Sequence, residues 1–412
     1  MTMPPEDPKP GSVIGKRSLT ALLWMINLSS ISASVLVYIF LAHHALRELD
    51  SLLVSEFVLF APMVVPVILA FQLSSLAARL EVRMLLRLTN ALGAAACLVL
   101  FLFSTLNTWV ILIGATVVGA LDAIQRVARI VVIKQYFSTD ELKFTVPLTL
   151  TAQFIAGAVA GAIMAFFPSQ MTAGATATAT ISLFAGAALC TFLLPPSAGE
   201  APHGQAGSFR LANGLQLLRE LPALRRSLVS FVLLGSFFQG FYNISRVALP
   251  AYHLGLSQQY VGLLQIVASL AAVAGALYFY FMSRRGAAFD LRYIYPACAA
   301  AMFAACIGRS WPESYPLYFA YFFLFELAFF RLQADIMAAA PKHQMPMVAA
   351  LQYALVYAGM MLAIFVGAFT VKWFGLAATA ALFAAGFGAA QFVRWRAASR
   401  VSLYAAPPER IR

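Results

Sequence analysis

The stretch that decides the fold runs from residue 119 to residue 167: GALDAIQRVARIVVIKQYFSTDELKFTVPLTLTAQFIAGAVAGAIMAFF. It predicts an apolar helix with charges near its end, a short polar turn, and a second apolar helix with the pattern Gly157-x-x-x-Gly161. The charges are Asp122, Arg126 and Arg129. Spacings of three and four residues place them on one helix face, and a membrane helix keeps such charges only where they face protein or water. Glycines spaced by four allow close helix contact.

The composition of the whole chain points to the same environment. Of its 412 residues, 62% are hydrophobic and 11% are charged, against about 25% charged in soluble domains. Apolar runs of about 20 residues, the length that crosses a bilayer as a helix, recur along the chain. They lie at 19–41, 52–73, 88–105, 108–133, 145–167, 172–194, 227–250, 258–282, 291–308, 314–338, 348–371 and 374–395. The sequence therefore predicts an all-α, polytopic membrane protein with twelve transmembrane helices.

A linker divides the apolar runs into two sets of six. The residues after Leu194 are rich in Pro, Gly, Ala and Ser, a composition typical of linkers. Residues 209–226 carry apolar side chains near helical spacing together with four arginines, which predicts a helix at the cytoplasmic membrane surface, attracted to anionic lipid. The expected parts are a flexible cytoplasmic tail (1–18), an N-terminal six-helix bundle (19–194), a cytoplasmic linker with an amphipathic helix (195–226), a C-terminal six-helix bundle (227–396) and a basic cytoplasmic tail (397–412).

The basic residues predict the orientation in the membrane. The net charge is +12, from 28 Lys and Arg against 16 Asp and Glu. With both termini on one side, all but four of the basic residues fall on that side. The four exceptions are Arg47, Arg246, Arg309 and Lys372. This asymmetry predicts that both termini are cytoplasmic. Nucleic acid is excluded as a partner because the charges are spread over many loops and no nucleic-acid motif accompanies them.

Four of the predicted spans carry polar residues on one face, as expected for a surface that meets water or protein. The residues are Asn27, Ser30, Ser34 and Tyr38 in the first span, Asp122 and Arg126 in the fourth, Gln239, Asn243 and Arg246 in the seventh, and Glu326, Arg331 and Asp335 in the tenth. Three alternatives remain open. Ser and Asn also make interhelical hydrogen bonds of about 0.6–2 kcal/mol. Arg246, near the end of its span, is compatible with a snorkelling anchor, and Arg129 and Lys134 with cytoplasmic-end anchors.

The sequence excludes several classes of function. There is no metal-ligand cluster, no activated Ser or Cys arrangement, and no Gly-rich loop with Lys of the kind that binds nucleotides. The chain is thus expected not to be an enzyme and to need no metal or other cofactor. The four cysteines lie inside predicted spans and form no C-x-x-C pair, so no disulfide or zinc site is expected.

Three segments resemble the major facilitator superfamily, and most closely its branch of macrolide and enterobactin exporters. The segments are 122–164, 213–229 and 249–265. The family's antiporter motif in the fifth helix is G-P-x-x-G-G; this chain keeps Gly157 and Gly161 but has alanines for the proline and the last glycine. The loop between helices 2 and 3 departs further, because Ala78 stands where the family has an acidic residue. The resemblance implies two six-helix bundles around a central cavity lined by helices 1, 4, 7 and 10, with alternating access as the halves rock.

Residues of the four polar faces are the candidates for the site that this resemblance implies. Substrate-binding candidates are Arg126, Arg246, Arg331, Asn27, Gln239 and Asn243, and the helix-packing residues are Gly157 and Gly161. Asp122 and Glu326 are the first candidates for reversible protonation, followed by Glu56 and Asp335, because removal from water favours the neutral form of a carboxyl. Arg126 and Arg331, as neighbours of the two carboxyls, are expected to favour the ionised form.

The expected function is secondary active transport across the cell inner membrane by a monomer, with protons and membrane lipid as partners. Several buried arginines favour an anionic or zwitterionic amphiphile, since guanidinium groups match carboxylates. The degenerate motif at residues 157–161 favours proton-coupled export, as an antiporter, of a small metabolite such as a siderophore or drug. The alternative is a proton-coupled importer of a small polar nutrient such as a sugar, amino acid or peptide.

Overall fold

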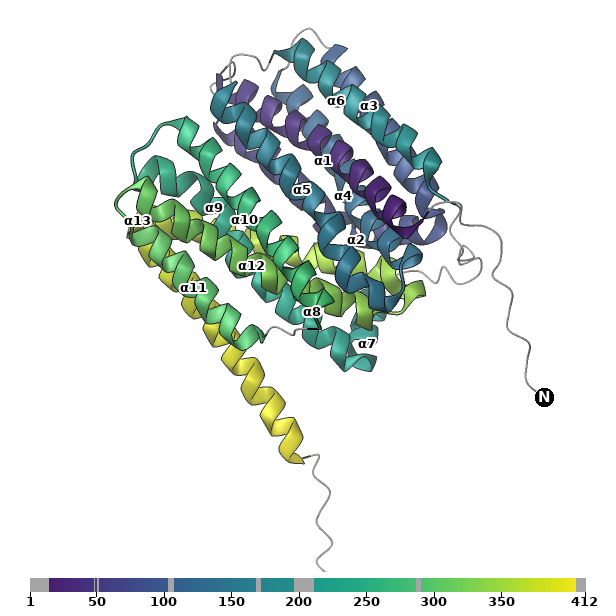
Figure 1. The fold of residues 1–412 in the computed structure, drawn as a ribbon. Coiled ribbons are helices and arrows are strands. Elements are labelled where there is room, and N and C mark those ends of the chain that lie inside the picture. The colour runs from purple at the N-terminus through teal and green to yellow at the C-terminus, as the bar shows by residue number, and fades with distance from the viewer. Residues whose placement is uncertain are drawn as a thin grey trace, which may run out of the picture.

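The computed structural model of the chain describes residues 15–47, 49, 52–102, 107–167, 172–195, 211–286 and 290–404, and within these ranges it contains helices and no strand. The α-helices are α1 (Lys16–Arg47), α2 (Leu52–Arg79), α3 (Val82–Leu102), α4 (Thr108–Tyr136), α5 (Thr139–Phe166), α6 (Ala173–Cys190), α7 (Leu211–Glu220), α8 (Pro222–Leu234), α9 (Gly240–Val247), α10 (Gln258–Arg284), α11 (Leu291–Ile307), α12 (Trp311–Ala339) and α13 (Met345–Tyr404) (Figure 1).

Each predicted span coincides with a helical segment, which confirms the all-α, polytopic membrane fold. Eight helices among the described residues are long and apolar enough to cross a membrane. The last two predicted spans are joined in the 60-residue α13, which is interrupted at Gly375. The φ angle of Gly375 is 80°, in the left-handed region that residues other than glycine rarely adopt. Residues 1–14 of the predicted tail, 196–210 of the predicted linker and 405–412 of the predicted basic tail lie outside the described residues.

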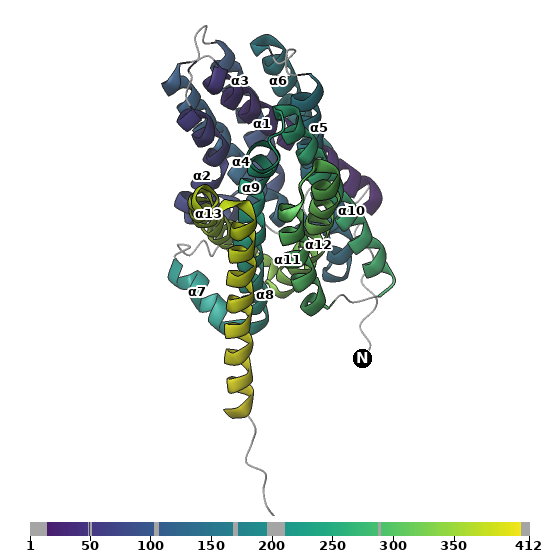
Figure 2. The same cartoon turned by 90° about the vertical axis from the view of Figure 1, so that its left-hand side faces the viewer.

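The helices form two groups that follow the chain order (Figure 1). Helices α1 to α6 pack on one another, with α1 against α5 and α6, and α3 against α4 and α6. Helices α8 to α13 form the second group, in which α12 packs on α10 and α11. The groups meet along α5 with α10 and along α2 with α13. Beyond these contacts, the end of α13 projects past the other helices (Figure 2).

The contact between α5 and α10 depends on the two glycines that the sequence pattern singles out. A Cβ atom at Gly161 would lie 3.0 Å from the carbonyl oxygen of Gly262, and one at Gly157 would lie 3.2 Å from Ser269 Oγ. Backbone cannot move aside as a flexible side chain can, so Gly161 allows an approach that a larger residue would prevent. Both glycines thus lie in the contact between α5 and α10, and their role in helix packing stays a prediction.

Replacing Gly161 with leucine should therefore separate α5 from α10. Overpacking of this kind costs about 1–3 kcal/mol, so the thermal midpoint of the purified protein in detergent should fall. Gly186→Leu in α6 is the matched control, because a Cβ there has nothing within 4 Å. Equal midpoints for the two variants would contradict this account of the contact.

The seventh span is built from four consecutive helical pieces rather than one regular helix. Between α8 and α9 lies a π-helical segment, Gly235–Gln239, and a second one, Ala248–His253, follows α9. Such π-segments widen the helix locally and are frequent at functional sites. The first segment ends at Gln239, one of the substrate-binding candidates, and packs on α13 through Gly235, whose Cβ position is 2.8 Å from Val356.

The amphipathic stretch after the linker forms a helix, as predicted, but its apolar face meets protein. Leu217 and Leu218 of α7 are buried in the main hydrophobic core. Gly214 lies against Leu351 at the start of α13. These leucines therefore pack on the C-terminal group of helices. The attraction of this helix to anionic lipid at the cytoplasmic surface stays a prediction.

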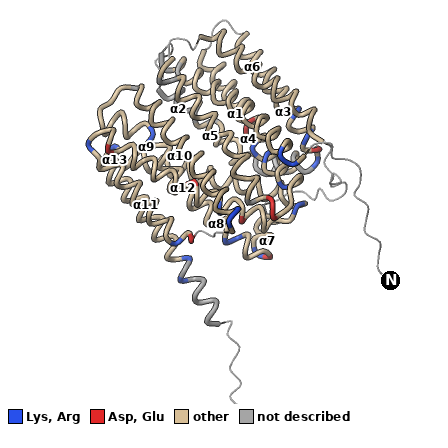
Figure 3. Tube along the Cα trace, viewed as in Figure 1, with Lys and Arg blue, Asp and Glu red and all other residues tan. Residues whose placement is uncertain are grey.

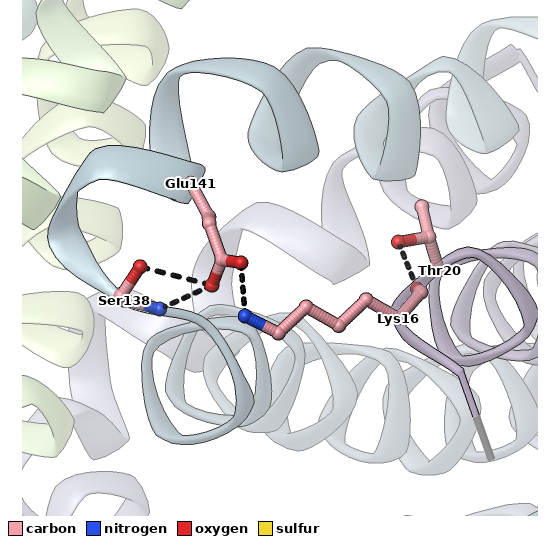
Figure 4. Close-up of polar contacts among 4 residues, drawn as sticks. All are labelled: Lys16, Thr20, Ser138 and Glu141. Atoms are coloured by element: carbon pink, nitrogen blue, oxygen red, sulfur yellow. Dashed lines mark hydrogen bonds and ion pairs between the residues drawn. The ribbon is translucent and has the colours of Figure 1, made fainter.

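A polar contact fixes the start of α1 to the start of α5 (Figure 4). The Glu141 carboxylate accepts hydrogen bonds from the backbone N–H and the hydroxyl of Ser138, both at 2.9 Å, which is the capping arrangement of a helix N-terminus. Lys16 forms an ion pair with the same carboxylate. This cluster lies within the N-terminal group of helices and orients the turn between α4 and α5.

Candidate transport site

The centre of α4 carries a buried ion pair. Arg126 Nε donates to Asp122 Oδ2 at 2.7 Å, as their spacing of four residues predicts. The two side chains differ in environment: Asp122 is 1% exposed, whereas Arg126 retains 23% exposure. The second carboxylate oxygen, Oδ1, is buried and has no hydrogen-bond partner. The pair therefore has one free acceptor, on Asp122, and one partly accessible cation.

Polar residues from α1 and α13 surround this pair. Tyr38, whose buried hydroxyl has no hydrogen-bond partner, lies within electrostatic range of Asp122. Tyr353 and Tyr357, whose rings stack with centroids 5.8 Å apart, lie within range of Arg126. Asn27 of α1 is also buried, with an unpartnered amide nitrogen. Hydroxyl and aromatic groups of α1 and α13 thus lie near the charges on α4.

Arg129 is the residue of this site whose burial the sequence did not decide. It is 1% exposed, so the alternative of an end anchor reaching water is wrong. Its NH1 atom donates to Gln153 Oε1 of α5 at 3.5 Å, and its Nε has no partner. The signal in the sequence was its spacing of three residues from Arg126, which places both guanidinium groups on one face of α4.

Glu326 is the second buried carboxyl, on α12. It is 1% exposed, and its Oε2 has no hydrogen-bond partner. Its Cβ is 3.0 Å from the position of a Cβ at Gly275, so α12 and α10 approach closely here. Within the described residues Glu326 has no ion pair. Arg331 is not its partner as expected, since Arg331 Nε pairs instead with Asp335 Oδ2 at 3.1 Å.

The other candidates lie at different depths. Arg331 and Asp335 are more than a third exposed, so Asp335 is far more accessible than Asp122 or Glu326. Arg246 lies 5.8 Å from the centroid of the Tyr242 ring. Gln239 and Asn243 are half-buried, and their contact is the bond from the Asn243 amide to the Gln239 carbonyl, at 3.0 Å. Glu56 belongs to α2, and its side chain lies outside the described residues.

Tyr242 connects Arg246 to the contact between the halves. Its hydroxyl donates to Gln265 Oε1 at 2.7 Å, and Gln265 Nε2 donates to Ser269 Oγ at 3.3 Å. The same Gln265 and Ser269 lie against Gly161 and Gly157 of α5. A polar chain thus runs from the seventh span to the α5–α10 contact.

At one end of the bundle a lysine crosses between the two groups of helices and connects them. Buried Lys134, near the end of α4, donates its Nζ to the main-chain carbonyl of Met337 in the last turn of α12. The last carbonyls of a helix lack intrahelical partners and carry partial negative charge, so they favour a cation. Nearby, Gln352 of α13 donates to Gln333 of α12 at 2.5 Å. Lys134 thus holds α4 against α12.

Removing this lysine should open that end. A hydrogen bond from a charged group contributes about 1.5–3 kcal/mol, enough to shift an equilibrium about tenfold or more. In a Met337→Cys background, Lys134→Met should speed maleimide labelling of the new thiol in inside-out vesicles about tenfold. Lys16→Met is the control, because its ion pair lies within the N-terminal group. A labelling rate unchanged by Lys134→Met would refute the closing role.

Charged residues are distributed unevenly along the bundle. In Figure 3 most Lys and Arg segments lie towards the end at which α7 and the start of α8 are found. Arg394 NH1 donates to Ser230 Oγ of α8 at 2.8 Å, and the guanidinium group of Arg87 lies over the Phe192 ring. Among the described residues no group of three or more His, Cys, Asp and Glu is placed to hold a metal ion.

A helical membrane bundle in two halves with buried charges near its centre defines a secondary transporter rather than an enzyme. The family model of the Major Facilitator Superfamily matches residues 22–334. The chain belongs to this superfamily, which confirms that it transports small molecules and performs no enzymatic reaction. No curated protein matches the sequence at a significant level.

Solved structures share the fold at low sequence identity. The human organic anion transporter MFSD10 (TETRAN) superposes with a TM-score of 0.74 at 14% identity, covering 91% of this chain and 98% of that one. A bacterial homologue of the iron transporter ferroportin, in its outward-facing state, gives 0.68 at 12%, covering 92% and 99%. The E. coli fucose:proton symporter gives 0.68 at 12%, covering 90% and 96%.

Proposed function

We propose that this protein is a proton-coupled secondary transporter of a small anionic amphiphile. The observation that carries the proposal is the charge of the site on α4. Asp122 offsets one of the two guanidinium groups, and Arg129 leaves one positive charge without a carboxylate among the described residues. An uncompensated buried cation is costly, and an anionic substrate would neutralise it while the tyrosines of α13 cover its apolar part.

The Asp122–Arg126 pair supplies a means of coupling. Protonation of Asp122 would release Arg126 to bind an anionic group, and an anion on Arg126 would in turn favour protonation of Asp122. By linkage, each binding event strengthens the other by the same factor. This arrangement favours movement of proton and anion together rather than the antiport expected from residues 157–161, which would need the two to compete. Glu326 is the second carboxyl that we propose on the path of the same proton.

The direction we propose is export of a metabolite that accumulates in the cytoplasm, which drives its own efflux together with a proton. The likeness of residues 122–164 to macrolide and enterobactin exporters supports export of a siderophore or similar carboxylate- or catecholate-bearing compound. A relative in fold carries organic anions and another couples to protons, according to their names. Import of a polar nutrient is the second candidate, because a proton gradient directed inward would drive the same cycle in reverse.

Orientation and assembly complete the proposal. We place the protein in the cell inner membrane as a monomer, in contact with lipid, with both termini cytoplasmic. The closed end at Lys134 then faces the cytoplasm. Reporter fusions after His203 and after Arg412 should both report a cytoplasmic location, because the basic residues favour that side. A periplasmic signal from either fusion would contradict this orientation.

Deletion of the gene tests the function in the cell. Under iron limitation the extracellular amount of a carboxylate- or catecholate-bearing metabolite should fall and its intracellular amount should rise. Reintroduction of the wild-type gene is the control and should restore both. Unchanged secretion together with greater sensitivity to neutral or cationic drugs would contradict the proposal and indicate general drug efflux.

A further inference from the structure

We propose that Arg129 is the carboxylate-binding residue of the transport site and captures its ligand when the Lys134 end of the bundle opens. The inference rests on the proposed function and deepens it, because it assigns the anionic group of the substrate to one side chain. Neither the polar faces of the sequence nor the fold assigns Arg129 this role.

The first step is the unmet hydrogen-bonding capacity of a fully buried cation. A guanidinium has five N–H donors in a planar fork. Arg129 is 1% exposed, its Nε has no partner, and the hydrogen bond from its NH1 to Gln153 Oε1 is long at 3.5 Å. Buried charges are otherwise paired and hydrogen-bonded. The site is therefore incomplete without an anionic group.

The second step is the difference between the two arginines of α4. Arg126 already has a carboxylate partner at 2.7 Å, whereas Arg129 has none among the described residues. With Asp122 ionised, the three side chains sum to one positive charge, which a single carboxylate offsets. With Asp122 protonated, they sum to two, so protonation strengthens the attraction for the same carboxylate.

The third step is the chemistry around the guanidinium. Gln153 of α5 offers an amide beside it. Tyr353 of α13 lies within electrostatic range, and its ring stacks on that of Tyr357. A planar aromatic acid matches these neighbours, since its carboxylate can take the guanidinium fork while its ring packs on the tyrosines. Hydroxyl substituents would have Gln153 as a partner.

The position of Arg129 along α4 supports the same role. Arg129 lies between Arg126, which keeps partial exposure, and Lys134, which holds the closed end. A ligand bound at Arg126 would therefore lie on one side of Arg129 along α4. A ligand entering past Lys134 would approach Arg129 from the other side. When the contact of α4 with α12 opens, Arg129 becomes the first unpaired cation that an anion from that side reaches.

A purely structural role predicts the opposite effect on stability. If Arg129 stabilised the fold through Gln153, its removal would lower the thermal midpoint. If it is an unpaired buried charge kept for a ligand, an apolar residue of similar volume should raise the midpoint. Arg129→Met makes this distinction, and Arg129→Lys keeps the charge without the fork.

The experiment measures the thermal midpoint of the full-length protein in detergent with increasing 2,3-dihydroxybenzoate, and with its uncharged amide. A ligand that binds the folded state raises the midpoint in proportion to its occupancy. The wild type should be stabilised by the acid and not by the amide. Arg129→Met should start from a higher midpoint and bind the acid about 10- to 100-fold more weakly, with Arg129→Lys between the two.

Arg87→Met is the matched control, because Arg87 lies on Phe192 and Thr191, away from the site; it should bind the acid as the wild type does. If the acid does not raise the thermal midpoint of the wild type, the proposal of an anionic substrate is overturned. A wild type stabilised by the acid together with an Arg129→Met variant of equal affinity would overturn the inference about Arg129 and leave the proposed function standing. A lowered midpoint in Arg129→Met without ligand would also overturn the inference.

Discussion

Asp122→Asn should abolish proton-driven accumulation of the anion while leaving its binding intact or tighter. The substitution keeps the shape of the side chain but removes the charge that occupies Arg126. A gradient of one pH unit corresponds to about 1.4 kcal/mol, or about tenfold accumulation for one proton per anion. In reconstituted vesicles the accumulation ratio should therefore fall from about ten to about one. Exchange of labelled for unlabelled anion should continue, because exchange needs no change in protonation.

Asp140→Asn is the control for this prediction. Asp140 is an exposed acid in the first turn of α5, and its loss should leave the accumulation ratio at the wild-type value. The Asp122→Asn protein should also be less stable, because the remaining partly buried Arg126 loses its partner. Undiminished accumulation by Asp122→Asn would show that this carboxyl carries no proton.

Glu326→Gln should lose proton-driven accumulation and gain stability. Glu326 has no cation beside it among the described residues and an oxygen without a hydrogen-bond partner. An ionised carboxylate in such a place is costly, whereas glutamine has the shape of the protonated acid. A residue retained despite this cost is expected to serve the transport cycle. The thermal midpoint should stay equal or rise while the accumulation ratio falls to about one, since a proton that no longer moves contributes none of the roughly tenfold drive.

Glu313→Gln on the same helix is the matched control. Glu313 is exposed in the first turn of α12, where it accepts a hydrogen bond from the Arg309 backbone N–H at 2.9 Å. Its loss should leave transport unchanged. A strongly lowered midpoint in Glu326→Gln would instead assign Glu326 a structural role in the contact of α12 with α10.

The helices could be predicted because apolar length is a property of the local sequence. The Asp122–Arg126 pair could be predicted for the same reason, since the spacing of four residues places both on one helix face. The spacing of Gly157 and Gly161 indicated a close helix contact, but the residues that they meet on α10 could not be predicted.

Contacts between distant segments could not be predicted. The pairing of Glu326 with Arg331 was wrong for a local reason, since Arg331 and Asp335 have the same spacing of four residues as the Asp122–Arg126 pair and form the second such pair. The sequence was compatible with Lys134 as an end anchor. Its hydrogen bond to the end of α12 joins segments that are far apart in the chain and could not be predicted. Arg129 was ambiguous because its burial depends on the packing of other helices around it, including α5 with Gln153. The apolar face of α7 met protein for the same reason, through Leu351 of α13.

The most direct measurement of the central claim is uptake of labelled 2,3-dihydroxybenzoate into proteoliposomes across a gradient of one pH unit. If anion and proton move together, the anion should accumulate about tenfold on the alkaline side. The direction of accumulation should reverse with the gradient, and a protonophore should abolish it. Uptake should exceed the uptake into protein-free liposomes. The labelled amide should only equilibrate. Equal uptake with and without the gradient, or accumulation on the acidic side, would contradict the account.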